Sequence, residues 1–137
     1  MIAVDIKTPS VTFGGYEQSK LLPNSEVLWY PLKHNRLWGL DLISMKLGDS
    51  FLSQSGMALI DSFMPGIVLP SLEYTRFVEH LNSSSGTNQR YEGLECVNGS
   101  CKLIGRKCSS IENPEDLKIN FLSEDYLHVP LASYSIT

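Results

Sequence analysis

An acidic residue directly follows an apolar segment near the middle of the chain. Met57–Ile60 has the composition of a buried strand, and Asp61 and Ser62 come immediately after it. A buried carboxylate is costly unless it is hydrogen-bonded or neutralised, so an acid at this place is unusual. From its place alone, Asp61 fits a turn acid whose side chain accepts hydrogen bonds from nearby backbone amides. Ser62 is interpreted as a loop hydroxyl, because no histidine is placed near it to activate a nucleophile.

Three cysteines lie within one short stretch of the second half of the chain. Four residues separate Cys96 from Cys101, and six more separate Cys101 from Cys108. These spacings match no usual zinc pattern, and no histidine lies near enough in sequence to be an obvious fourth ligand. We predict a disulfide loop between Cys96 and Cys101, because Gly99 lets the chain reverse tightly there. Cys108 is left over, and an odd cysteine in an oxidised protein suggests a partner outside this chain.

The remaining groups that could do chemistry are scattered. The three histidines are interpreted as surface or interface residues rather than ligands: His34, His80 and His128. Asp41 lies in an apolar alternation that points its side chain away from the core. Residues 64–66 are no phosphate cradle, because a glycine-rich loop with a following lysine is missing. We therefore predict no metal site and no cofactor.

Two glycosylation sequons bear on the compartment. Asn82 and Asn98 each begin an N-x-Ser triplet in a segment that we interpret as turn-rich, which favours the secretory pathway, the vacuole or the extracellular space. The chain does not open with a signal peptide, since Asp5 and Lys7 interrupt the first apolar residues. We expect either that the segment was excised from a longer precursor or that the protein is not secreted.

Length and charge exclude several classes of protein. The 137 residues are enough for one domain, and 11 basic against 15 acidic residues give a net charge of −4. An acidic chain argues against nucleic-acid binding, which normally requires a basic face. No apolar run approaches the roughly 20 residues of a membrane-spanning helix. Hydrophobic residues make up 42% of the chain, so it can form a core.

Short apolar alternations between turn residues predict an all-β domain with one short helix. The expected strands are Val11–Phe13, Glu26–Tyr30, Leu37–Leu47 as one bent strand or two, Phe51–Leu52, Gly56–Ile60, Leu117–Phe121 and Tyr126–Pro130, with turns at Gly48–Asp49 and Ser123–Asp125. The helix is expected over Ser71–Leu81, because Leu72, Thr75, Val78 and Leu81 follow one face. The polar stretch Asn82–Asn88 is predicted to end the helix as a mobile loop.

Residues 58–70 resemble the second catalytic loop of the pepsin-like aspartic peptidases. In that family two apolar residues precede Asp, then Thr or Ser, then Gly, then Thr or Ser, and a proline and a short helix follow. Asp61 and Ser62 match the first two loop positions, and Pro70 with the helix after it matches the loop's end. The resemblance implies one lobe of a bilobal β-barrel protease in which Asp61 would be one of two catalytic carboxylates.

The flanking segments agree with the same family in order and spacing. They are Val11–Leu21, Leu28–Leu32, Leu37–Met45, Cys108–Ile111, Pro114, Leu117–Phe121 and Val129–Leu131. The resemblance covers about residues 8–134 and implies that residues 1–137 are a partial C-terminal lobe. Trp29, Tyr30 and Trp38 are then expected to pack in the core or between the lobes.

Three consecutive residues depart from the family's loop. Phe63 replaces the glycine at which the backbone packs closely, and Met64 replaces a hydroxyl that hydrogen-bonds within the loop. Pro65 then removes a backbone donor and fixes φ. All three changes affect the part of the loop that holds the carboxylate, so the sequence favours the turn-acid role for Asp61.

The resemblance also implies parts that lie outside this chain. The family's first catalytic Asp and the flap over the substrate come from an N-terminal lobe, and the apolar strand beneath the catalytic loop would follow Thr137. The second partner of the cysteine that resembles Cys108 would lie there as well. We therefore expect a fragment or subunit that is covered by the missing N-terminal lobe or by other protein chains.

Three interpretations follow. In the first, the chain belongs to a peptidase-like protein that has lost activity and serves as a binding or structural component, which Phe63 favours. In the second, it is part of an active endopeptidase that hydrolyses peptide substrates at acid pH, with the other lobe supplying the second Asp. In the third, it is an unrelated small β-domain whose matches to the family are accidental.

Overall fold

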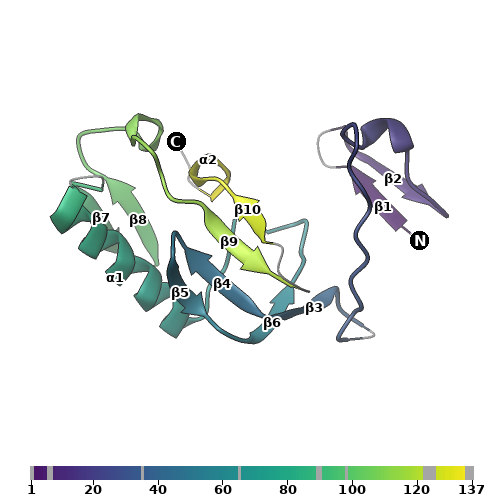
Figure 1. Cartoon of the computed structure of the whole chain (residues 1–137), viewed down its shortest axis with the longest axis horizontal. Coiled ribbons are helices and arrows are strands. Elements are labelled where there is room, and N and C mark those ends of the chain that lie inside the picture. The colour runs from purple at the N-terminus through teal and green to yellow at the C-terminus, as the bar shows by residue number, and fades with distance from the viewer. Residues whose placement is uncertain are drawn as a thin grey trace. The chain divides into compact units, whose positions relative to one another are not determined.

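The structure is a computed structural model that describes residues 2–5, 8–34, 36–64, 66–88, 91–97, 99–121 and 126–134. It divides into two compact units, Met1–Pro31 and Leu32–Thr137, which are described separately. Strands dominate the described residues, and one long helix accompanies them (Figure 1). The predicted fold class is therefore confirmed.

The first unit is built on a two-stranded antiparallel ladder. Strands β1 (Ile2–Asp5) and β2 (Ser10–Phe13) pair directly, and a 3-10 turn, η1 (Gln18–Lys20), follows. The strand expected at Val11–Phe13 is thus confirmed. The strand expected at Glu26–Tyr30 is wrong, because these residues are irregular. A strand forms only when a neighbour takes up its backbone hydrogen bonds, and no described strand pairs with this segment.

The second unit contains a four-stranded antiparallel sheet in the order β10-β9-β4-β5. Its strands are β4 (Ser44–Leu47), β5 (Ser50–Ser53), β9 (Leu117–Asn120) and β10 (Leu127–Val129). The predicted turn at Gly48–Asp49 joins β4 to β5, and Gly48 adopts a φ of 58° that suits glycine. The expected strands near Phe51, Ile119 and His128 are confirmed. The predicted turn at Ser123–Asp125 lies outside the described residues.

A second ladder leads directly into this sheet. Strands β3 (Gly39–Leu42) and β6 (Gly56–Leu59) are antiparallel, and only Ile43 separates β3 from β4. The apolar segment Leu37–Leu47 therefore forms two strands, one of the two expected forms. The Ile43 amide donates a hydrogen bond to the Asn120 carbonyl oxygen at 2.9 Å, which ties the junction to the end of β9.

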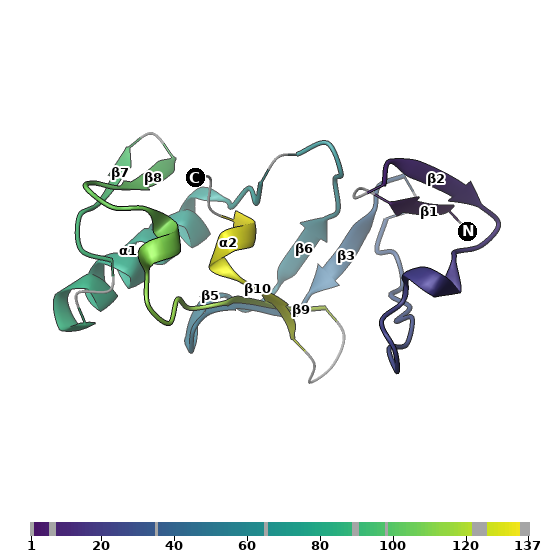
Figure 2. The same cartoon turned by 90° about the horizontal axis from the view of Figure 1, so that it is seen from above.

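The helix α1 (Ser71–Asn88) lies beside β5 and the hairpin of β7 (Leu94–Val97) and β8 (Ser100–Leu103), as Figures 1 and 2 show. The helix expected to begin at Ser71 is confirmed, but its predicted end and the loop at Asn82–Asn88 are wrong. This polar stretch contains no proline, so the backbone hydrogen bonds can continue beyond Leu81.

The core of the second unit lies between the sheet and α1. Its buried apolar residues are Met45, Leu47, Leu52, Leu81, Tyr91, Ile111 and Leu117. Met45 and Leu47 alternate on one face of β4, so the opposite face of the same strand carries Ser44 and Lys46. Arg76 joins the helix to the sheet, because its Nη1 donates to the Leu52 carbonyl oxygen at 2.9 Å.

Short elements complete the second unit. The 3-10 turn η2 (Cys108–Ser110) precedes β9, and the one-turn helix α2 (Leu131–Tyr134) follows β10. Both lie next to the core through residues that are half-buried against it, among them Cys108 and Leu131. The loop after β6 thus runs from the β3–β6 ladder to the start of α1.

Candidate functional site

The loop after β6 holds Asp61 in a tight turn. The Ile60 amide donates to the Trp38 carbonyl oxygen at 2.9 Å, so the β3–β6 ladder continues to the residue before Asp61. Asp61 Oδ1 then accepts a hydrogen bond of 2.9 Å from the Phe63 amide. This contact of an aspartate with the backbone two residues later is an Asx turn. The structure therefore gives Asp61 the hydrogen bond that the turn-acid interpretation requires.

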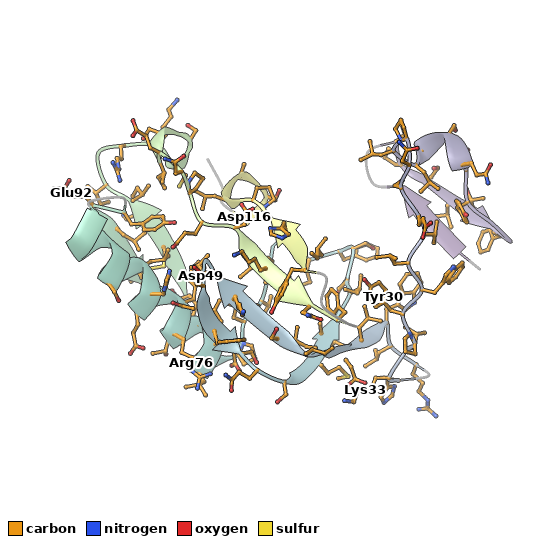
Figure 3. The ribbon with its side chains drawn as sticks, viewed as in Figure 1. Tyr30, Lys33, Asp49, Arg76, Glu92 and Asp116 are labelled. Carbon is orange, nitrogen blue, oxygen red and sulfur yellow. A yellow bond between two sulfur atoms is a disulfide. The ribbon has the colours of Figure 1, made fainter. Side chains whose placement is uncertain are left out.

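No second carboxyl group contacts Asp61 in the part of the chain that the structure describes. The Phe63 amide is its only hydrogen-bonding or charged partner there, and the Asp61 side chain is exposed. The carboxylate of Asp41 pairs instead with the ammonium group of Lys33, which is labelled in Figure 3. Asp41 thus points away from the core, as predicted. Two carboxylates share a proton only when they face each other closely, and Asp61 has no such neighbour among the described residues.

The loop and the strand before it expose a large apolar surface. Phe63 has 95% of its surface exposed, and Leu59 and Ile60 have 55% and 50%. The expectation that Met57–Ile60 is a buried strand is therefore half right: the strand forms, but it is not buried in this chain. The β3–β6 ladder has only two strands, so no described third strand lies along either of its outer edges. Pro65 lies outside the described residues.

The comparison with protein-family models decides the family. The model described as "Eukaryotic aspartyl protease" matches residues 3–137. The chain belongs to the eukaryotic aspartyl protease family. The pepsin-like family predicted from the sequence is thereby confirmed, and the interpretation as an unrelated β-domain is excluded. The mostly β architecture with its helix is consistent with a lobe of a pepsin-like aspartyl protease. Comparisons with curated proteins and with solved structures found no significant match.

The predicted disulfide is present in this aspartyl protease domain. Cys96 and Cys101 are bonded across the β7–β8 hairpin, where they are directly opposite each other in the register. Gly99 in the connecting turn has a φ of 79°, which confirms the tight reversal expected there. The Tyr74 hydroxyl of α1 lies 3.6 Å from Cys101 Sγ, so the disulfide packs against the helix. Cys108 is a free, half-buried thiol.

The histidines differ in their surroundings. His34 and His128 are exposed, as expected, and His128 Nδ1 lies 3.4 Å from Asp116 Oδ2. His80, expected at a surface or an interface, is half-buried, and its side chain is 17% exposed. Its Nε2 lies 2.8 Å from Glu115 Oε2, so the pair joins α1 to the segment before β9. Sequence reasoning missed this pair, because 35 residues separate its members.

The sequon asparagines and the tryptophans were also predicted from the sequence. Asn82 is exposed but lies within α1 rather than in a turn, and Asn98 lies outside the described residues. Trp29 and Trp38 have 65% and 52% of their surfaces exposed, so packing in a core of this chain is wrong for both. Packing against another lobe stays a prediction for them.

The described residues contain no group of three or more His, Cys, Asp or Glu side chains that could hold a metal ion. Within the same described residues, no helix is both long enough and apolar enough to cross a bilayer.

A polar cluster on the outer face of the sheet was not predicted from the sequence. The Ser44 Oγ and Tyr126 hydroxyl oxygen lie 3.4 Å apart, and the Lys46 ammonium lies 5.2 Å from the Tyr126 ring centroid. Hydrogen bonds from Ser44 and from Lys46 lower the pKa of Tyr126, and the positive charge of Lys46 acts in the same direction. Ser44 and Lys46 alternate with two core residues along β4, which indicates a polar face of that strand. The sequence did not indicate which strands pair with β4.

Proposed function

We propose that the chain is a segment of the C-terminal lobe of a pepsin-like aspartyl protease domain that does not use Asp61 for catalysis. In this proposal the domain serves as a binding or structural component. The observation that carries it is the changed loop: Phe63 stands where the family has glycine, and 95% of its surface is exposed. A carboxylate that works in a dyad needs a second carboxyl within hydrogen-bonding reach to share its proton.

The residues after Asp61 support the same proposal. Ser62 continues the family's pattern, but Phe63 and Met64 do not. Phe63 has 95% of its surface exposed and Met64 has 49%. A phenylalanine in place of glycine prevents the close backbone packing that the family's loop uses. The loop is therefore built for a turn and an apolar surface rather than for holding a reactive carboxylate.

The exposed apolar surface supports a partner. Met57, Leu59 and Ile60 of the β3–β6 ladder are each about half exposed, as is Trp38 beside them. Exposed apolar surface and open strand edges mark interaction sites in soluble proteins. We propose that the N-terminal lobe of the same protein, or another protein chain, covers this surface.

The proposed location is the secretory pathway, the vacuole or the extracellular space. A disulfide between Cys96 and Cys101 persists in an oxidising compartment. The eukaryotic aspartyl protease family is compatible with this location. Asn82, which begins a sequon, is exposed and therefore accessible for glycosylation.

The test is a peptidase assay on the full-length protein at acid pH, with Asp61→Asn as the matched variant. The proposal predicts that the wild type and Asp61→Asn hydrolyse a pool of unstructured peptides equally, at the level of a blank. Hydrolysis by the wild type that Asp61→Asn abolishes would contradict the proposal and establish the active endopeptidase. The variant keeps an oxygen that can accept from the Phe63 amide, so the turn itself is preserved.

A further inference from the structure

A row of cationic and aromatic side chains crosses the outer face of the four-stranded sheet. In the register, Lys46 of β4 is opposite Phe51 of β5 on one side and Lys118 of β9 on the other. Lys118 in turn is opposite His128 of β10. Directly opposite residues share a face of the sheet, so all four side chains lie on the side away from the core.

The lysines of this row differ in their partners. Lys118 Nζ lies 3.5 Å from Oδ1 of Asp49, a residue of the turn that joins β4 to β5 and labelled in Figure 3. Lys46 Nζ lies 4.3 Å from the centroid of the Phe51 ring and 5.2 Å from that of the Tyr126 ring. Among the described residues no carboxylate pairs with Lys46. Its ammonium group is therefore held in place by two aromatic rings with its charge available.

Hydroxyl groups complete the surroundings of this ammonium group. Ser44 Oγ lies 3.4 Å from the Tyr126 hydroxyl, and Ser44 is on the same face of β4 as Lys46. The pKa of Tyr126 is lowered, first by the hydrogen bond from Ser44 and then by Lys46. A place that stabilises the negative charge of a phenolate oxygen also stabilises other oxyanions.

We propose that Lys46 and Tyr126 form a binding site for a carboxylate group of an acidic peptide segment. The lysine supplies the charge and the Tyr126 hydroxyl supplies a hydrogen bond, while Ser44, which is only 6% exposed, positions that hydroxyl from behind. The rings of Phe51 and Tyr126 form the apolar walls beside the bound chain. Charge complementarity selects this occupant, because a cation that has no carboxylate partner among the described residues and lies on a partly apolar surface gains most from a carboxylate. The site lies on a different sheet from Asp61, so it does not depend on whether Asp61 is catalytic.

The test is an NMR titration of the full chain with a blocked pentapeptide that contains two aspartates. The matched probe contains two asparagines instead. We expect the aspartate peptide to shift the amide signals of Lys46 and Tyr126, and the asparagine peptide to leave them unchanged. Added sodium chloride weakens the binding, and this readout needs no variant.

Substitutions at the two lysines distinguish binding at Lys46 from a general attraction to the positive charge of the row. Lys46→Gln is expected to weaken binding about tenfold, which corresponds to the loss of one charged hydrogen bond. Lys46→Arg is expected to retain most of the affinity. Lys118→Gln is the matched control and is expected to change the affinity less than about twofold, because Lys118 already has Asp49 as its partner.

Two results would overturn the proposal. One is an equal response to the aspartate and asparagine peptides, which would show that the carboxylate is not recognised. The other is an equal loss of affinity in Lys46→Gln and Lys118→Gln, which would show only a general attraction to positive charge. Far-ultraviolet circular dichroism of each variant confirms that the sheet is intact.

Discussion

Two leucines that differ widely in exposure test the packing of the second unit. Leu47 of β4 is fully buried between the sheet and α1, with 0% of its surface exposed. Leu47→Ala removes three buried carbon atoms, which is about 2.4 kcal/mol of transfer free energy at about 0.8 kcal/mol for each. The cavity that is left adds to this cost, so we expect the free energy of unfolding to fall by about 3 kcal/mol. Urea unfolding followed by circular dichroism measures the change.

The matched control is the same substitution in the other ladder. Leu59 of β6 is 55% exposed, so Leu59→Ala removes less than half as much buried surface and leaves no closed cavity. We expect a loss of about 1 kcal/mol in the isolated chain. If both variants lose the same free energy of unfolding, the placement of the core between the sheet and α1 is refuted. In the full-length protein the loss for Leu59→Ala should rise if a partner covers this ladder.

Three further predictions concern local features of the second unit. Gly93→Ala should lower the unfolding free energy by about 2 kcal/mol more than Gly99→Ala does. Both glycines have positive φ, but only at Gly93 would a new Cβ lie 2.9 Å from a backbone oxygen. Equal losses in urea unfolding would contradict this close contact at Gly93. Replacing both Cys96 and Cys101 with serine should lower the unfolding free energy by about 2 kcal/mol through the small loop that they close, as measured by thermal unfolding against the oxidised wild type; an unchanged stability would contradict the bond. Tyr126 should ionise at lower pH than an ordinary tyrosine in an ultraviolet titration, because Ser44 and then Lys46 stabilise its phenolate. Because the pKa of Tyr126 is lower in the folded chain, ionised Tyr126 stabilises the fold. This stabilisation is present above the unfolded pKa of about 10 and is lost as the pH falls through the pKa of the folded chain.

Local patterns in the sequence predicted most of the strands and the start of the helix. The alternation around Ile119 and the turn at Gly48 specify a strand and a hairpin through interactions between near neighbours. The helix start at Ser71 has the same origin. Its end was missed because a polar composition indicates exposure rather than the absence of a helix, and nothing in Asn82–Asn88 breaks the backbone ladder.

Contacts between distant segments could not be predicted in the same way. Ser44 and Tyr126 are 82 residues apart, and their contact depends on the register of three strands. The exposure of Leu59 was missed for a related reason. Apolar composition indicates that a surface becomes covered, but not whether the same chain covers it.

The residues that follow Asp61 in the sequence indicated its role. Phe63 and Met64 pointed to a turn acid, and the hydrogen bond from the Phe63 amide to Asp61 Oδ1 agrees with that interpretation. The family itself was recognisable from the order of several short motifs, each of which is weak alone. The match to the family model over residues 3–137 confirms it.

Binding of a pepstatin-type transition-state mimic tests the central claim most directly. Such a mimic binds an intact carboxylate dyad far more tightly than a substrate does, so calorimetry on the full-length protein at acid pH is decisive. Our account predicts no saturable binding, with an active pepsin-like peptidase as the positive control. Tight, saturable binding by the wild type that is lost in Asp61→Asn would contradict it.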